Sequence, residues 1–203
     1  MIELNNVAYS YSGGALLSDI SISLAPGSFH FLTGPSGAGK TTLLKTINRE
    51  LYPVVAEGSW VRILGKDHWN VWELRRHIGI VSHDLHQRYT PTTTAVAVVV
   101  SGFYSSIGVH GTLAGQVSGK QLEAARTVLD RLGIGNLADT PLRSMSTGQQ
   151  RRCLLARALV QDAPVLLLDE PTGSMDNSSE ESIKQALAEV IEGKTVMLIT
   201  HRA

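Results

Sequence analysis

The sequence predicts an α/β fold with a mainly parallel sheet, an antiparallel β region near the N-terminus and an inserted helical lobe. Val165–Leu168 and Val196–Ile199 are continuous apolar runs, as expected of parallel strands that are buried on both faces. A short apolar strand at 29–33 runs directly into a glycine-rich loop at 34–41. Residues 84–145 carry mainly helical or irregular patterns instead. We therefore expect a sheet built around the glycine-rich loop, with the lobe inserted into it.

Apolar residues in the N-terminal part alternate with polar ones, which is typical of strands. A first set is spaced like an edge strand and a second set precedes the turn at Pro26-Gly27: Ile2, Leu4 and Val7, then Ile20, Ile22 and Leu24. The helix that follows the glycine-rich loop has its apolar residues on one side: Leu43, Leu44 and Ile47. These patterns predict an antiparallel region, followed by a helix that packs by one face.

The middle of the chain contains a clear helix start. Ser118 and Gln121 have the spacing of a capping box, and Gly133 ends the helix that follows. Apolar residues recur along this helix at helical spacing: Leu122, Ala125, Val128, Leu129 and Leu132. A further helix is expected at 185–191, between the last two strands. We predict one domain over residues 1–203, with a core of 1–83 and 146–203 and a helical lobe of 84–145.

Composition limits the classes of function. Of 203 residues 43% are hydrophobic, Lys+Arg and Asp+Glu number 18 each, and the pI is about 7.1. Proteins that grip nucleic acid through its phosphates usually carry a basic excess, so no nucleic-acid partner is expected. The single cysteine, Cys153, excludes an intramolecular disulfide and is expected to be a core residue. No apolar run is long enough for a bilayer and no signal peptide is recognised, so we expect a cytoplasmic protein.

Residues 34–41 match the phosphate-loop pattern G-x-x-x-x-G-K-[ST] in full. Its glycines allow backbone conformations in which successive N–H groups point at phosphate oxygens. Lys40 can place its ammonium between the β- and γ-phosphates, and the Thr41 hydroxyl can ligate Mg²⁺. A plain glycine-rich turn is the alternative, but the preceding strand and following helix favour a nucleotide site. The candidate ATP-binding residues here are Gly34, Pro35, Ser36, Gly37, Ala38, Gly39, Lys40, Thr41 and Thr42.

Two acidic residues directly follow the apolar run at 165–168. Asp169 can hold Mg²⁺ through water at the end of a buried strand, and Glu170 can polarise the attacking water. Strands often end in acids, so this signal is weak alone and becomes strong beside a phosphate loop.

About twenty residues before Asp169, the sequence reads Met145-Ser146-Thr147-Gly148-Gln149-Gln150 and continues into an arginine-rich helix at 151–159. This segment resembles the signature of the ABC ATPases, usually Leu-Ser-Gly-Gly-Gln. A simple Ser-capped helix is the alternative reading of Ser146. The resemblance implies that Ser146, Gly148 and Gln149 grip the γ-phosphate of ATP bound to a second subunit.

The resemblance extends over nearly the whole chain and carries further expectations. Tyr11 lies where the family has an aromatic that stacks on adenine. Residues 173–176 resemble the D-loop, which crosses the dimer interface, and His201 matches the switch histidine that contacts the γ-phosphate. The family implies catalysis by Glu170, His201 and Lys40 with ATP and Mg²⁺, in a head-to-tail homodimer or ABC heterodimer.

The chain departs from the family pattern at three points. His83 occupies the position of the glutamine that usually contacts Mg²⁺ and water, so the family pattern does not assign this contact to His83. Gln87 is close in the sequence but out of register. Thr147 replaces the first signature glycine, and we hypothesise slow hydrolysis because its Cβ crowds the incoming phosphate. Family members normally continue with another strand and helix after His201, so we expect a truncated or unusually minimal version.

Resemblance to subfamilies is mixed. Residues 1–45 and 169–201 look like ATPases of the bacterial cell-division or lipoprotein-export type. Residues 81–108 look like the soluble ModF or photorepair-type ABC ATPases.

The leading hypothesis is therefore an ATPase subunit that energises a membrane transport or related complex through ATP-driven dimerisation. It would lie at the inner face of the cell membrane through integral membrane partners. A soluble, non-transport ABC switch and an ATP-dependent dimerisation clamp with little turnover remain alternatives. A small-molecule kinase would share the phosphate loop but leave the signature segment unexplained.

Overall fold

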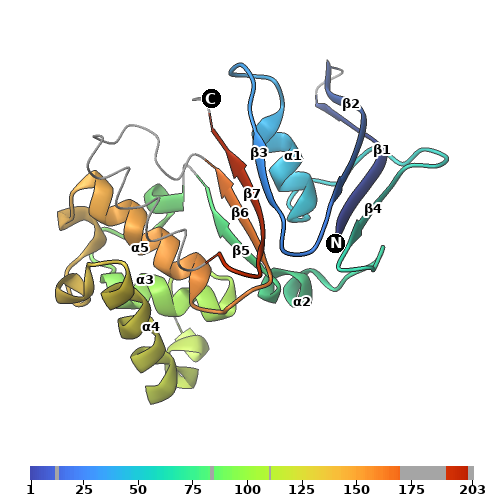
Figure 1. Ribbon diagram of the computed structural model, residues 1–203. Coiled ribbons are helices and arrows are strands. Elements are labelled where there is room, and N and C mark those ends of the chain that lie inside the picture. The colour runs from blue at the N-terminus through green and yellow to red at the C-terminus, as the bar shows by residue number, and fades with distance from the viewer. Residues whose placement is uncertain (12–13, 83–84, 110, 170–190, 201–203) are drawn as a thin grey trace.

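The computed structural model describes residues 1–11, 14–82, 85–109, 111–169 and 191–200. These residues form two sheets and a helical lobe (Figure 1). The α/β fold with its parallel sheet, N-terminal antiparallel sheet and helical insertion confirms the predicted fold class.

The antiparallel sheet has the strand order β2-β1-β4. Its strands are β1 (Ile2–Tyr11), β2 (Gly14–Leu24) and β4 (Trp60–Ile63). The predicted edge position of β1 is wrong, because β4 pairs with it on the side opposite β2. Alternation along β1 could not reveal this pairing, since β4 lies far away in the sequence.

The parallel sheet has the strand order β3-β7-β6-β5. Its strands are β3 (Phe29–Leu32), β7 (Thr195–Ile199), β6 (Val165–Asp169) and β5 (Ile78–Val81). All three pairings are parallel, in register from Val165↔Thr195 to Asp169↔Ile199 in the central pair. The two apolar runs near the C-terminal end of the sequence are parallel strands, as predicted, and the structure places them at the centre of the sheet.

The parallel sheet contributes to two hydrophobic cores, one on each face. Leu166 and Leu168 of β6 pack with the helical lobe, whereas Val165 and Leu167 pack with the antiparallel sheet and α1 (Lys40–Ile47). Because side chains alternate along a strand, a continuous apolar run satisfies both cores. In Figure 1 the lobe accordingly lies on one side of the parallel sheet, and the antiparallel sheet lies on the other.

The remaining helices lie in the lobe or against β5 of the parallel sheet. They are α2 (Val71–Arg76), α3 (Ala95–Val100), α4 (Gly119–Arg131) and α5 (Thr147–Leu159), with 3₁₀ turns at Leu85–Arg88, Ser101–Tyr104, Gly111–Gln116, Gly135–Leu137 and Leu142–Ser144. The predicted capping box exists, with Ser118 paired with Gln121 at α4, and the structure shows a second one, with Ser146 paired with Gln149 at α5. Of the apolar residues at helical spacing in α4, Ala125 and Leu129 are buried, whereas Leu122 near its N-terminus is exposed.

Candidate functional site

The phosphate loop joins β3 to α1 and places Lys40 at its centre. The Lys40 ammonium donates to the carbonyl oxygens of Gly34 at 2.7 Å and Pro35 at 2.8 Å. Its side chain is buried although it carries a charge. Burial of an ammonium is costly unless the group is hydrogen-bonded, and the loop's own carbonyls meet that need.

Gly39 lets the loop pass very close to β2. Its φ is +84°, a left-handed conformation, and it precedes the first residue of α1. A Cβ built on Gly39 would lie 2.7 Å from the Leu16 carbonyl oxygen and 2.9 Å from Leu17 Cδ2. Glycine is thus required here both by conformation and by space.

The N-terminus of α1 faces the same loop. Gly39 cannot cap the helix with a side chain, and no acidic residue occupies the first turn. The N–H groups and the positive end of the helix dipole can therefore act on an anion.

A recess of about 270 Å³ lies at this loop. It is lined by Leu16, Ser36, Gly37, Gly39, Lys40, Thr41 and Thr42. Six of the nine predicted ATP-binding residues of the phosphate loop thus line one recess. Gly34 and Pro35 contribute the carbonyls that hold Lys40, and the Ala38 N–H donates to Pro35 O at 3.3 Å.

Leu16 lines this recess and was not predicted as a site residue. It is 44% exposed on β2, next to the buried Leu17. Asp19 has a positive φ, and the register of β2 against β1 shifts nearby. This irregularity exchanges the two faces of the strand, which the alternation of Ile20, Ile22 and Leu24 could not signal.

The Thr41 hydroxyl joins the phosphate loop to the end of β6. It donates a hydrogen bond of 3.0 Å to the Asp169 Oδ2 atom. Asp169 is the last residue of β6 and is only 4% exposed. The parallel pairing of β6 and β7 places the carboxylate at the carboxyl edge of the sheet, where α/β folds hold ligands. Two oxygen ligands of the kind Mg²⁺ prefers thus lie side by side.

The signature residues lie at the N-terminus of α5. The Ser146 hydroxyl accepts from the Gln149 N–H at 3.3 Å, and the Gln149 side chain accepts from the Ser146 N–H at 2.9 Å. Ser146 and Thr147 are exposed, and Gly148 and Gln149 are half-buried. None of these four residues lines the phosphate-loop recess of the same chain.

Tyr11 ends β1 and is 69% exposed, opposite Gly14 in the hairpin with β2. It does not line the recess, although the same hairpin supplies Leu16. His83, Glu170, the D-loop segment at 173–176 and His201 lie outside the described residues, as does most of the expected helix at 185–191. Cys153 is a buried core residue, as predicted.

The parallel sheet, the phosphate loop and the carboxylate beside it define a P-loop nucleotide-binding protein. Residues 17–173 match the protein family described as ABC transporter. The chain therefore belongs to the ABC transporter family, and it is an ATP-binding cassette of the ATPase class.

Individual relatives agree with this assignment. The chain is 36% identical to the ABC transporter ATP-binding protein ModF of Escherichia coli K12 over its whole length, and it spans 41% of that protein. It is 35% identical to the manganese transport system ATP-binding protein MntB of Bacillus subtilis 168, covering 98% of this chain and 76% of that one. The ModF resemblance, expected from residues 81–108, thus extends over the full chain.

Solved structures of cassettes are also similar. The dimeric post-hydrolysis structure of the ATP-binding cassette MJ0796 bound to ADP and Pi has a TM-score of 0.83 at 28% identity. The match covers 99% of this chain and 88% of the MJ0796 chain. In the described part of the chain, no helix is long and apolar enough to cross a membrane.

Proposed function

We propose that this cassette binds and hydrolyses MgATP and energises a membrane transport or related complex through ATP-driven dimerisation. The observation that carries the proposal is the hydrogen bond between Thr41, which lines the phosphate-loop recess, and Asp169. It brings together the groups that phosphoryl transfer needs on the β- and γ-phosphate side. Dimeric cassette structures among the relatives support the assembly.

Within the recess, the phosphates would replace the carbonyls that hold Lys40. Its ammonium would then balance negative charge between the β- and γ-phosphates, and the N–H groups of the loop and of α1 would bind their oxygens. Thr41 and Asp169 would hold Mg²⁺, which when bound neutralises phosphate charge. Tyr11, at the exposed end of the hairpin, would stack on the adenine.

The rest of the chemistry rests on residues assigned by the family pattern. Glu170 would polarise the attacking water, and His201 would contact the γ-phosphate. Ser146, Gly148 and Gln149 would close the site from the second subunit in a head-to-tail arrangement. The exposure of Ser146 and the absence of all three residues from the recess of their own chain support a shared site.

The proposed division of labour places catalysis in residues 1–83 and 146–203 and partner docking in the lobe, 84–145. The membrane partner would be an integral subunit, which would hold the cassette at the inner face of the membrane. The names of relatives such as the manganese transport ATP-binding protein support a transport role.

A dimerisation clamp with little turnover is the second candidate. Thr147 is exposed at the first position of α5, where a phosphate from the other subunit would approach Ser146 and Gly148. A Cβ at this position would crowd that phosphate and slow hydrolysis without preventing assembly.

Phosphate release from ATP, measured on the purified protein beside Glu170→Gln and Lys40→Ala, tests the proposal. We expect turnover in the wild type, loss of turnover with a MgATP-dependent dimer in Glu170→Gln, and loss of nucleotide binding in Lys40→Ala. A dimer in MgATP with negligible wild-type turnover would favour the clamp. Neither turnover nor a dimer, in folded protein that binds ATP, would overturn both.

A further inference from the structure

A second recess, of about 440 Å³, lies beside β4, at the end of α1 that is opposite the phosphate loop. We call it the β4 recess. All the described residues of its lining come from one stretch of the chain, 49–71. They are Arg49 just after α1, the loop at 52–55, the start of β4 with the residue before it, and the stretch at 67–71. None of them lines the phosphate-loop recess, so the two recesses are separate.

The loop at 52–55 forms an apolar wall of the β4 recess. Tyr52, Val54 and Val55 are all exposed, and Val55 is 98% exposed. The Val54 N–H donates to the Ala8 carbonyl oxygen at 2.8 Å, which ties this loop to β1. Exposed apolar side chains gathered around a recess are typical of sites that bind a ligand.

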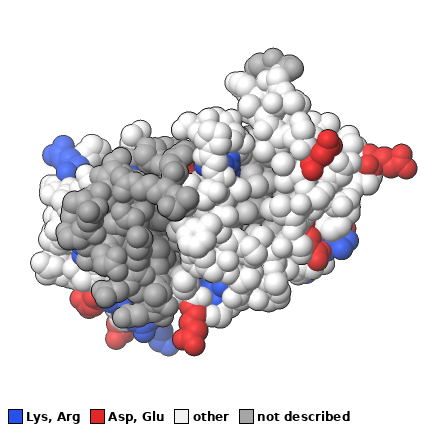
Figure 2. Space-filling view, turned by 45° about the horizontal axis from the view of Figure 1, so that its top comes forward, with Lys and Arg blue, Asp and Glu red and all other residues white. Residues whose placement is uncertain are grey.

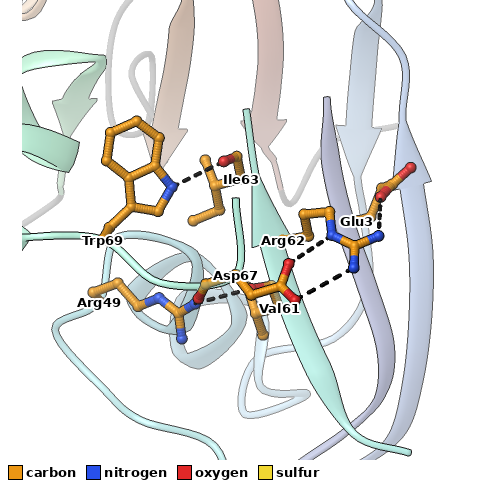
Figure 3. Close-up of polar contacts among 7 residues, drawn as sticks. All are labelled: Glu3, Arg49, Val61, Arg62, Ile63, Asp67 and Trp69. Atoms are coloured by element: carbon orange, nitrogen blue, oxygen red, sulfur yellow. Dashed lines mark hydrogen bonds and ion pairs between the residues drawn. The ribbon is translucent and has the colours of Figure 1, made fainter. Parts of the chain in front are cut away.

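Trp69 adds an aromatic wall in a fixed position. Its side chain is half-buried, and its indole N–H donates to the Ile63 carbonyl oxygen at 2.9 Å (Figure 3). The Lys66 ammonium lies 4.6 Å from the centre of the ring. Because the indole N–H is already bonded within the fold, the ring offers a ligand apolar surface.

Arg49 supplies a cation that has hydrogen-bond donors to spare. Its guanidinium donates to the carbonyl oxygens of Val61 at 2.9 Å and Asp67 at 3.1 Å, both through Nη2 (Figure 3). Within the described residues, its Nε and Nη1 atoms make no hydrogen bond or ion pair. A guanidinium has five N–H donors, so those at Nε and Nη1 can bind a ligand.

The backbone of Arg49 is in a conformation that favours glycine. Its φ is +56°, in the left-handed region, and it directly follows Asn48, the C-cap of α1. Glycine is the usual residue at this point because it has no Cβ. A long charged side chain thus stands where the backbone disfavours it, and strained residues of this kind are often found at ligand sites.

The carboxylate in the described lining leaves room for an anion. Asp67 accepts hydrogen bonds from Arg62 Nε at 2.6 Å and Nη2 at 3.3 Å. Figure 3 shows this carboxylate directed at Arg62, whereas Arg49 contacts the main-chain oxygen of Asp67. The hydrogen bond from Arg62 holds the pKa of the Asp67 carboxyl below its usual value, so the two side chains neutralise each other. An incoming anion therefore meets Arg49 with its charge largely unmatched.

We propose that the β4 recess binds a small amphipathic anion, whose acidic group pairs with Arg49 and whose apolar body lies between Trp69 and the loop at 52–55. A guanidinium suits a carboxylate or sulfonate, because its donors form a planar fork. The volume of the recess lies in the range of small-molecule sites. Phosphate alone would use the cation and leave the apolar walls in water. The site goes beyond the proposed function and does not depend on it, since its residues lie outside the phosphate-loop recess.

Fluorescence titration of the full chain with two probes tests this inference. The first, 8-anilinonaphthalene-1-sulfonate, carries a sulfonate on an aromatic body, and the second, N-phenyl-1-naphthylamine, has the same body without the sulfonate. Arg49→Gly removes the guanidinium and suits the positive φ. It should weaken binding of the sulfonate at least tenfold and change binding of the neutral probe less than twofold. Excess ATP should not displace the sulfonate from the wild type.

A second pair of variants tests the apolar wall. Val55→Asp places a carboxylate on that wall and should weaken binding of the sulfonate at least fivefold. Ala56→Asp is the matched control, because Ala56 is exposed next to Val55 but does not line the recess. It should bind the sulfonate within twofold of the wild type.

Equal affinity of the sulfonate for the wild type, Arg49→Gly and Val55→Asp would overturn the inference. So would an equal loss of both probes in Arg49→Gly, because the arginine would then only shape the recess. Displacement of the sulfonate by ATP would overturn it too, since the probe would then lie in the nucleotide site. In NMR spectra the probe should shift the indole N–H signal of Trp69 and leave that of Trp72, which does not line the recess. The reverse pattern would contradict the proposed location.

Discussion

Alanine substitutions at two phosphate-loop glycines separate the cost of conformation from the cost of contact with β2. Gly37 and Gly39 have similar positive φ values, +80° and +84°. A Cβ on Gly37 meets nothing within 4 Å, whereas one on Gly39 would lie 2.7 Å from the Leu16 carbonyl oxygen. The left-handed conformation costs a non-glycine residue about 1–2 kcal/mol, and both variants bear that cost.

Only Gly39→Ala adds the steric cost. Forcing backbone and side chains apart in a packed region costs about 1–3 kcal/mol, so Gly39→Ala should lose about 3 kcal/mol and Gly37→Ala about 1 kcal/mol. For a chain of this length, 1 kcal/mol corresponds to roughly 2–4 °C in Tm. We therefore expect Tm to fall by roughly 6–12 °C in Gly39→Ala and by roughly 2–4 °C in Gly37→Ala.

Thermal unfolding of both variants without nucleotide, followed by circular dichroism, measures this difference. Equal losses of Tm would refute the reasoning, because β2 would then not be a rigid wall behind the loop. A wild-type Tm in Gly39→Ala would refute it as well.

Three further predictions concern single side chains. Thr41→Val removes the donor to Asp169 and a Mg²⁺ ligand, so ATP turnover should fall by about tenfold or more. ATP binding in EDTA should stay near the wild-type value. Turnover equal to that of the wild type would contradict the assignment of Thr41 as a Mg²⁺ ligand. Burial raises the pKa of the Cys153 thiol to about 12, so it stays protonated in the folded protein. Labelling of the thiol at pH 8 should therefore require unfolding, and rapid labelling of the folded protein would contradict this. The free energy of unfolding should decline as pH rises above the unfolded thiol's pKa of about 8.5 toward 12. Hydrogen bonding from Arg62 lowers the pKa of the Asp67 carboxyl (Figure 3), so Arg62→Gln should raise that pKa in an NMR titration, and Arg126→Gln should not.

Local patterns were sufficient to predict the elements that carry the site. The phosphate loop and the capping box at Ser118 are short-range features, and the buried runs in β6 and β7 follow from a sheet covered on both faces. The carboxyl edge where Asp169 meets Thr41 follows from the parallel order.

Long-range features could not be predicted. The central position of β1 depends on its pairing with β4, and the exposure of Leu122 depends on which neighbours α4 finds. Leu16 reaches the phosphate recess through an irregular register in β2.

The surface adds one general constraint on partners. Figure 2 shows acidic and basic side chains mixed around the margin of one face of the molecule. This mixture agrees with the equal numbers of acidic and basic residues in the sequence.

Complementation between two inactive variants tests the central claim, a site shared between two cassettes, most directly. Lys40→Ala disables the phosphate loop, and Ser146→Arg disables the signature segment. Each variant alone should lack ATP turnover. A mixture should regain part of it, because a mixed dimer contains one intact phosphate loop facing one intact signature. Absence of turnover in a mixture that forms dimers, or full activity of Ser146→Arg alone, would contradict the shared site.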